Sequence, residues 1–270
     1  MEQIVKKSLP NPFSKKLDEL LANSWIQVEN KHPPNLYDTV MNTKEYKSNF
    51  RVLLLDEQEN RCCYCMRDMS ETEVNLEHII PNKANKDKYA EYANEPIDQS
   101  GFVHKDDFKP SRSEATYPAY PHDIAYQNLI AACETFPHCN CTSNNSRGSK
   151  FMPTFTYYKG ITKALLVSSS GELRFTSVSN FDEKYLGIKY LNLNTDMLKL
   201  FRATWRFACS SYTIEDLKSA DERKRMDFLM EAYPLVKSEK DTFELDNEGI
   251  WHEFLRYSWF YDYFKNSLTI

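Results

Sequence analysis

Two groups of cysteines have the residue types and the spacing that most directly predict chemistry. Six of the seven cysteines fall in these groups, at Cys62, Cys63 and Cys65 and at Cys133, Cys139 and Cys141. The two-residue gap between Cys62 and Cys65 lets two thiolates from one tight turn reach a single tetrahedral zinc ion. Such a pair needs a second pair. We therefore predict a structural zinc site of Cys62, Cys65, Cys133 and Cys139, with Cys141 as the alternative to Cys139.

An acidic residue beside a histidine lies between the two cysteine groups, in the segment Leu76-Glu77-His78-Ile79-Ile80-Pro81. This segment predicts a short β-strand that ends at the proline. Neighbouring side chains of a strand point to opposite faces, but a bulge or a strand end can bring both toward one metal ion. A divalent ion held by Glu77 would polarise a phosphodiester oxygen, while the neutral imidazole of His78 would take a proton from an attacking water. The alternative is that both are surface residues.

Asparagines flank the second cysteine group. The segment YQNLI, which contains Asn128, precedes Cys133, while Asn140 and the segment NNSRGSK at 144–150 follow Cys139. Amide oxygens suit Mg²⁺, which prefers oxygen ligands, and amides also cap turns. Asn128 and one later asparagine are therefore candidate site residues, with a turn or cap residue as the alternative for each.

The elements that must position these residues are mainly helical. Apolar residues at helical spacing predict helices over 13–25 and 46–60. Residues 82–121 are polar and contain four prolines, which predicts a long insertion with little regular structure. The segment LLVSSSGELRFTSV at 165–178 predicts a β-hairpin that turns at Ser170 and Gly171. From Thr195 onward the pattern is mostly helical.

Composition limits the class of protein. Hydrophobic residues make up 41% of the 270 residues and aromatic residues 14%, which is enough for one or two packed cores. The net charge of -5 argues against a surface made wholly for polyanions, so any contact with nucleic acid must be local or shared with a partner. No apolar run is long enough for a membrane span and MEQIVKKSLP lacks the apolar stretch of a signal peptide, so we expect a cytoplasmic protein. Reduced thiols there favour metal binding over disulfides, and the isolated Cys209 is predicted to lie in the core.

The motifs CCYC, LEHIIP, YQNLIAAC and HCN followed by NNSRG, in this order, resemble those of the zinc-containing HNH endonucleases. In that family the histidine of the acidic-histidine pair is the general base. The acidic residue and a later Asn or His hold the catalytic metal, and the middle Asn fixes the loop that carries the base. The resemblance implies the role of base for His78, of metal ligand for Glu77 and of loop anchor for Asn128.

The resemblance leaves two assignments for the second ligand of the catalytic metal. The family usually has a Lys three residues after this Asn or His, but Ser143 stands three residues after Asn140. If NNSRG is the equivalent stretch, Asn144 is the ligand and Arg147, with Lys150 nearby, binds the phosphate. We favour Asn144, with Asn140 as the alternative.

Further motifs extend the resemblance over residues 45–205. A helix running into CxYC, Gly187-Ile188, LNLN at 191–194, Leu198 and Arg202 are similar to the HNH subunit of Septu-type antiphage systems, the PtuB family. In such systems the nuclease acts with an SMC-like or ABC-like ATPase of the PtuA type, in some cases alongside a retron RNA–DNA element. The resemblance therefore implies a defence effector.

These patterns and the resemblance together predict an α+β protein with a mainly helical body. We expect an N-terminal helical segment at 1–60, a zinc-stapled HNH core of the ββα-metal type at 61–151, and a small β-hairpin with a C-terminal helical region at 152–270. The predicted activity is Mg²⁺- or Mn²⁺-dependent hydrolysis of phosphodiester bonds in DNA, with RNA such as tRNA as the alternative. The alternative is a zinc-stabilised module that binds nucleic acid or protein without catalysis.

A partner surface is also predicted. No phosphate-binding loop of the form GxxxxGK[ST] occurs, so nucleotide-driven control would come from the partner ATPase. An aromatic stripe in the C-terminal helical pattern would either dock that partner or pack on the chain's own core. Its residues are Trp251, Phe254, Leu255, Trp259, Tyr263 and Phe264.

Overall fold

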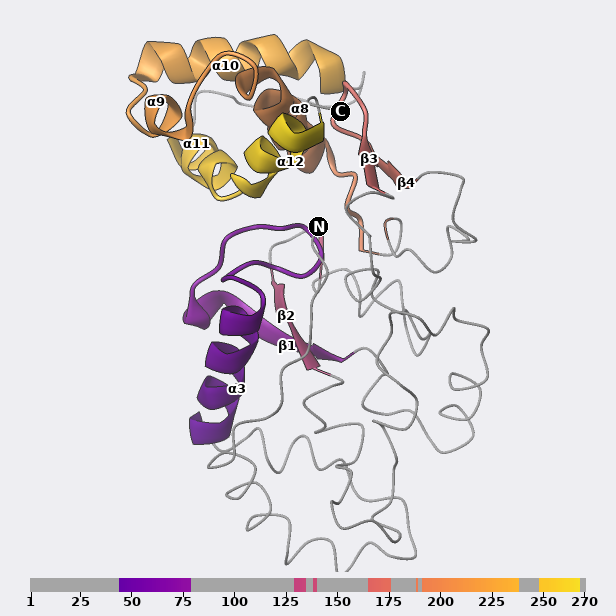
Figure 1. Cartoon of the computed structure of the whole chain (residues 1–270), viewed down its shortest axis with the longest axis vertical. Helices are drawn as coiled ribbons and strands as arrows, with labels where there is room; N and C mark the ends of the chain where they lie inside the picture. Colours follow the sequence, from indigo (N-terminus) through magenta and orange to yellow (C-terminus); the bar gives the residue numbers. More distant parts are fainter. Residues whose placement is uncertain are drawn as a thin grey trace, which may run out of the picture.

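The computed structural model describes residues 44–78, 129–134, 138–139, 165–175, 188, 191–237 and 248–267. Within these residues the protein combines helices with two small antiparallel sheets, β1 with β2 and β3 with β4. Helices α8 to α12 lie together with β3–β4 at their side, and α3 lies beside β1–β2 (Figure 1). The helices are α3 (Lys44–Glu57), the 3-10 turn η1 (Glu71–Glu73), α8 (Asp196–Ala208), α9 (Ile214–Lys218), α10 (Glu222–Val236), α11 (Glu248–Leu255) and α12 (Trp259–Ser267). The strands are β1 (Val74–His78), β2 (Leu129–Cys133), β3 (Leu165–Val167) and β4 (Leu173–Phe175).

Helix α3 confirms the helix predicted at 46–60, with shifted ends. Its apolar side is buried through Phe50 and Leu54. The helix stops because Glu59 and Asn60 take positive φ angles of 52° and 60°, which turn the chain out of the helical path. The other predicted N-terminal helix, at 13–25, and the predicted insertion at 82–121 lie outside the described residues.

Strands β1 and β2 pair in unbroken antiparallel register, from Val74 opposite Cys133 to His78 opposite Leu129, which confirms the predicted strand around Glu77-His78. The other edge of β2 is covered by a side chain from the end of α3. Gln58 donates from Nε2 to the carbonyl of Ala131 at 2.9 Å and accepts its N–H through Oε1 at 2.8 Å. The side-chain amide thus forms the two hydrogen bonds that the backbone of a neighbouring strand would form. It fixes β2, and with it Cys133, against α3.

Strands β3 and β4 form the hairpin predicted at 165–178. Gly171 lies in its turn with a φ of 76°, and a Cβ there would lie 1.9 Å from the carbonyl oxygen of Lys199 in α8. Glycine is required because the turn needs a left-handed residue that also packs directly on helix backbone. The side-chain amide of Asn194 holds the backbone of Leu173 through two hydrogen bonds, of 2.8 and 3.0 Å, so the hairpin is attached to the start of α8.

The C-terminal helices confirm the helical pattern predicted from Thr195. Thr195, Thr213 and Asp221 each cap a helix by accepting a backbone N–H in the first turn. Helix α8 is the centre of the group, because it packs against both α10 and α12. No helix within the described ranges is long and apolar enough to cross a membrane.

The predicted aromatic stripe belongs to the core, so its alternative role as a docking face is wrong. Trp251, for example, is 1% exposed and Phe254 is fully buried. The ring of Phe254 stacks on Trp205 of α8 with centroids 4.4 Å apart, and Trp205 donates from Nε1 to the carbonyl of Phe254 at 3.1 Å. The other buried members are Trp259, Tyr263 and Phe264, and Leu255 is partly buried against the same core. The stripe faces inward because its own chain supplies the apolar surface that it needs.

Cys209 was predicted to be a core residue, and this is confirmed only in part. The residue ends α8 and is half-buried at the edge of the core. Its Sγ donates to the carbonyl of Arg206 at 3.1 Å, an interaction within the last turn of the helix. Cys209 therefore helps to close a helix end and lies outside the main cysteine cluster.

Candidate metal centre

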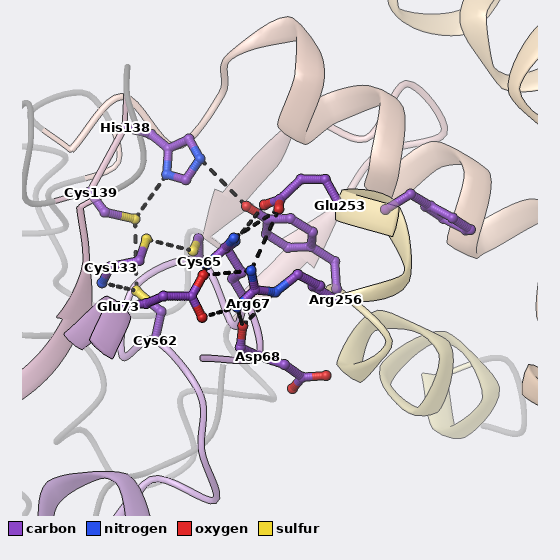
Figure 2. Close-up of polar contacts among 12 residues, drawn as sticks. Cys62, Cys65, Arg67, Asp68, Glu73, Cys133, His138, Cys139, Glu253 and Arg256 are labelled. Carbon is purple, nitrogen blue, oxygen red and sulfur yellow. Dashed lines mark hydrogen bonds and ion pairs between the residues drawn. The ribbon is translucent and has the colours of Figure 1, made fainter. Parts of the chain in front are cut away.

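Four buried thiols face one another beside the β1–β2 pair (Figure 2). The Sγ atoms of Cys62, Cys65, Cys133 and Cys139 all lie within 4.8 Å of one another. The Sγ–Sγ distance is 3.9 Å between Cys62 and Cys139 and 3.6 Å between Cys65 and Cys133. The structure therefore brings together the four cysteines that the sequence predicts as one set. The alternative ligand, Cys141, lies outside the described residues.

The size of this cluster suits a tetrahedral metal ion. Zinc binds thiolates at about 2.3 Å, which places the sulfur atoms of a tetrahedron about 3.8 Å apart. The distances of 3.6 and 3.9 Å match that spacing, and they are far longer than the roughly 2.05 Å of a disulfide bond. The four buried cysteines can thus hold a metal ion such as zinc. In the part of the chain that the structure describes, no other group of three or more His, Cys, Asp or Glu side chains is placed to share an ion.

The first cysteine pair comes from a tight loop that directly follows α3. The N–H of Met66 donates to the carbonyl of Cys62 at 3.1 Å, and the N–H of Cys62 donates to the carbonyl of Arg67 at 2.9 Å. Met66 takes a φ of 64°, which lets the chain reverse directly after Cys65. The loop at 61–68, here called the metal loop, therefore closes on itself and brings both thiols of the CxxC pair to one point.

The second pair is held by two separate anchors, which explains its wide spacing. Cys133 is the last residue of β2, so the sheet sets its position. The N–H of Cys139 donates to the carbonyl of Leu191 at 2.8 Å, and Cys139 takes a φ of 55°. Cys133 is fixed by the sheet and Cys139 by the segment before α8. The two cysteines therefore need not come from one tight turn, and their spacing in the sequence can be wider than in a CxxC pair.

The four thiols do not ionise alike in this buried site. Burial raises the pKa of Cys65 and Cys139, and hydrogen bonding with Cys133 adds to the rise. The hydrogen bond from Cys139 lowers the pKa of Cys133 to about 6. Burial acts to raise the pKa of Cys62, but hydrogen bonds from the neighbouring thiols outweigh it and the pKa is lowered. Without a metal ion, the cysteines with a raised pKa therefore keep their protons more readily than those with a lowered pKa. A bound divalent cation would favour the thiolate form of all four.

Sequence reasoning missed the residues that surround the sulfur atoms. The Nδ1 atom of His138 lies 3.1 Å from Sγ of Cys139, and the hydroxyl of Tyr257 lies 3.5 Å from Nε2 of the same ring. Arg202 is buried as well, and burial lowers its pKa to about 10 although the thiolates of Cys65 and Cys139 act in the opposite direction. The position of His138 directly before a ligand cysteine was a usable signal, while nothing in the sequence near Tyr257 indicated a role at this site.

An ion-pair network joins the metal loop to the end of α11 (Figure 2). Arg67 binds both carboxylate oxygens of Glu253 and also donates to Glu73 at 3.1 Å. Arg256 donates to Glu73 from both terminal nitrogens. The hydrogen bond from Arg256 holds the pKa of Glu73 well below its usual range, against the effect of burial. Two arginines and two glutamates therefore form one alternating cluster beside the sulfur atoms.

Glu77 and His78 are the last two residues of β1, and both are buried, at 9% and 8% exposure, so the alternative that they are surface residues is wrong. The regular register of β1 continues to His78, so the bulge considered from the sequence does not occur within this strand, and only the strand end at His78 can bring both side chains to one ion. Burial and Cys62 raise the pKa of Cys63, and the carboxylate of Glu77 adds to the rise.

The other predicted site residues lie outside the described part of the chain. They are Asn128, Asn140, Asn144, Arg147 and Lys150. A catalytic metal bound by Glu77 and one of the later asparagines stays a prediction.

No model of a protein family, no curated protein and no solved structure matched this chain in comparison. A proposal of function therefore rests on the chain's own residues. The described residues form mixed helices and small sheets with a cluster of four cysteines, and an acidic-histidine pair ends strand β1 beside it.

Proposed function

We propose that this chain is a nuclease of the HNH type, in which a structural zinc ion bound by four cysteines supports a strand pair that carries the catalytic residues. The observation that carries the proposal is the meeting of the two cysteine pairs at one end of β1–β2. Cys133 lies opposite Val74 at that end, and His78 lies at the other. Four residues of extended strand separate the two ends by about 13 Å. Zinc would therefore hold the strand pair without touching the substrate.

The proposed reaction is hydrolysis of a phosphodiester bond. A bound Mg²⁺ or Mn²⁺ ion would supply Lewis-acid stabilisation of the developing charge. Its proposed ligands are Glu77 and Asn144, with Asn140 as the alternative. The neutral imidazole of His78 would accept a proton from the attacking water, and Asn128 would fix the loop that carries this base. Arg147 and Lys150 would bind the phosphate by charge.

The proposed substrate is DNA, with RNA as the alternative, and the proposed partner is an SMC-like or ABC-like ATPase of an antiphage system. The net charge of -5 supports a partner, because a free acidic protein binds polyanions weakly. The docking site would lie outside the aromatic residues of α11 and α12, since these are buried in the core. Elution of the full chain alone after co-expression with such an ATPase encoded beside it would refute the partnership.

A non-catalytic zinc module is the second candidate, and one observation favours it. Glu77 and His78 are both buried, whereas a base and a metal ligand must reach the substrate, although this module was first expected to carry the two residues on its surface. Under this hypothesis the four-cysteine centre stabilises a surface that binds nucleic acid or protein. Both hypotheses include the zinc site, but only the nuclease hypothesis predicts cleavage of nucleic acid.

A cleavage assay on the full, zinc-loaded chain separates them. We expect the wild type to nick plasmid DNA with Mg²⁺ or Mn²⁺, and His78→Ala to lose 10²-fold or more of this activity, the scale of positioned general-base catalysis. Zinc content should stay unchanged. His252→Ala is the matched control, because His252 lies on the exposed side of α11, with its side chain 65% exposed. Activity retained in His78→Ala would refute the base, and a wild type inactive with every metal, alone or with the ATPase, would favour the binding module.

A further inference from the structure

A buried histidine lies between the metal centre and the C-terminal helices. His138 is 4% exposed and Tyr257 is 1% exposed. The His138 ring approaches Sγ of Cys139 through Nδ1 at 3.1 Å and the hydroxyl of Tyr257 through Nε2 at 3.5 Å. Tyr257 lies between α11 and α12, 119 residues further along the chain. Both ring nitrogens thus have a partner, and the partners come from two separate parts of the fold.

The direction of both hydrogen bonds follows once the four cysteines hold a metal ion. A metal-bound thiolate carries no proton, so Cys139 can only accept, and Nδ1 of His138 must donate. In a neutral imidazole the other nitrogen then has no proton and accepts. The hydroxyl of Tyr257 has one proton to give, and burial raises the pKa of Tyr257, which keeps that proton in place. The chain of donors therefore runs one way, from Tyr257 through His138 to the sulfur of Cys139.

The metal centre has a physical need for such a donor. A divalent ion with four thiolates carries a net charge of -2 in a buried site. One sulfur already accepts a backbone hydrogen bond, since the N–H of Cys133 lies 3.4 Å from Sγ of Cys62. Cys139 is fully buried and has the His138 ring as its side-chain donor. Hydrogen bonds of this kind orient the ligands and tune the metal.

We propose that His138 is a positioning residue of the metal centre, which donates to the Cys139 thiolate and is itself oriented by the hydroxyl of Tyr257. The proposal rests on the four-cysteine metal site and is independent of nuclease activity. It makes the corner between α11 and α12 part of the metal centre, although no residue of that corner is a ligand. The donor withdraws electron density from one sulfur, so it protects the Cys139–metal bond against protonation and exchange.

Cobalt substitution in the full chain tests the proposal without an activity assay. Co²⁺ replaces zinc in cysteine sites and gives a thiolate-to-metal charge-transfer band whose energy depends on electron density at the sulfur. We expect His138→Phe to shift this band to lower energy and to release the metal to a chelator about 10 to 100-fold faster, the usual range for loss of a residue that supports a ligand. His138→Asn should restore much of the wild-type behaviour, because the asparagine amide nitrogen can donate from about the position of Nδ1.

A second pair of variants isolates the tyrosine. Tyr257→Phe keeps the ring that packs 5.3 Å from Phe201 and removes only the hydroxyl, so a smaller shift of the band and a faster release than in wild type are expected. Tyr261→Phe is the matched control, because its hydroxyl donates to the carbonyl of Tyr212 at 2.9 Å, in the same helical region. The charge-transfer band and the rate of metal release of Tyr261→Phe should match those of the wild type.

The outcomes separate this proposal from the others. If His138→Phe folds and keeps the wild-type band and release rate, the proposal is overturned. If that variant fails to fold, Tyr257→Phe decides, and an unchanged band and rate in this variant overturn the proposal too. A wild type that binds neither cobalt nor zinc overturns it together with the metal site. A shifted band in a chain that never cleaves nucleic acid supports the positioning role and refutes only the nuclease.

Discussion

Arg67 and Glu253 form a two-point ion pair across 186 residues of chain, with Nη2 of Arg67 2.8 Å from one carboxylate oxygen and Nε bonded to the other. Arg67 lies two residues after Cys65 of the four-cysteine cluster, and Glu253 lies in α11. Arg256, in the same region as Glu253, binds Glu73 directly before β1. The metal loop and the C-terminal helices are therefore one structural unit, and loss of either should weaken the other.

Glu253→Gln should destabilise the protein by about 2 kcal/mol, because the variant leaves the mostly buried Arg67 without its strongest partner. Arg174→Gln provides the comparison. Arg174 pairs with Glu172 at 2.6 Å, but its side chain is 67% exposed, so its loss should leave stability close to that of the wild type. Urea unfolding followed by fluorescence measures both. Equal, small effects would show that the Arg67 pair is no stronger than a surface ion pair.

The acidity of Glu73 predicts a pH dependence. The hydrogen bond from Arg256 holds the pKa of Glu73 well below its value in the unfolded chain, which is about 4.3. A carboxyl group with a lowered pKa in the folded state contributes stability that is present above the unfolded pKa and is lost as the pH falls through the folded pKa. Glu73→Gln should therefore be destabilised most above about pH 5.

Unfolding of the wild type and of Glu73→Gln from pH 7 to about pH 3.5 measures that difference, which should narrow below about pH 4.3. Zinc content must be followed at each pH, since protonation of the thiolates releases the metal from both proteins. A difference in stability that stays constant over this range would contradict the role assigned to the Glu73 carboxylate.

The four-cysteine centre predicts one zinc ion per chain. Cys65→Ser should lose the zinc and much of the folded-state stability, because a structural zinc site contributes on the order of 10 kcal/mol of apparent binding energy in small modules. Cys209→Ser is the matched control, since Cys209 is half-buried and bonds only within α8. Elemental analysis and thermal unfolding measure both variants. A similar loss in Cys141→Ser with none in Cys139→Ser would replace the fourth ligand.

Local patterns in the sequence predicted the local elements and the four cysteines that the fold brings together. The CxxC gap was sufficient for Cys62 and Cys65, because a tight turn alone brings such a pair together. Gly171 marked the hairpin turn, and helical spacing marked α3 and the C-terminal helices. Each of these signals depends on neighbours in the chain, so no knowledge of the tertiary fold was needed.

The partners of the metal loop could not be predicted in this way. The contacts of Arg67 with Glu253 and of His138 with Tyr257 join segments more than a hundred residues apart. Nothing in the sequence of either segment indicates which other segment it contacts. The aromatic residues of α11 and α12 show a related limit. An apolar stripe says that a helix face is buried, but its spacing is the same whether the covering surface belongs to a partner or to the chain itself.

The buried aromatic residues of α11 and α12 should contribute strongly to the stability of the C-terminal helices. Trp251 packs with its ring centroid 5.0 Å from Phe254, which stacks on Trp205 of α8. Trp251→Ala should therefore cost about 3 to 5 kcal/mol, as for other large buried aromatic residues. Met230→Ala, on the exposed side of α10 with 52% of the residue exposed, should change stability by no more than about 0.5 kcal/mol.

Truncation after Asp246 removes α11 and α12 and exposes the apolar side of α8, so the shortened chain should be insoluble or unfolded. It should also lose zinc, because the contacts between the C-terminal helices and the metal loop are missing. Circular dichroism and zinc analysis of the purified fragment measure this. A truncated chain that stays folded and keeps its zinc would show that the two helices are needed neither for folding nor for the metal centre. A folded fragment without zinc would instead show that the C-terminal helices act mainly on the metal centre.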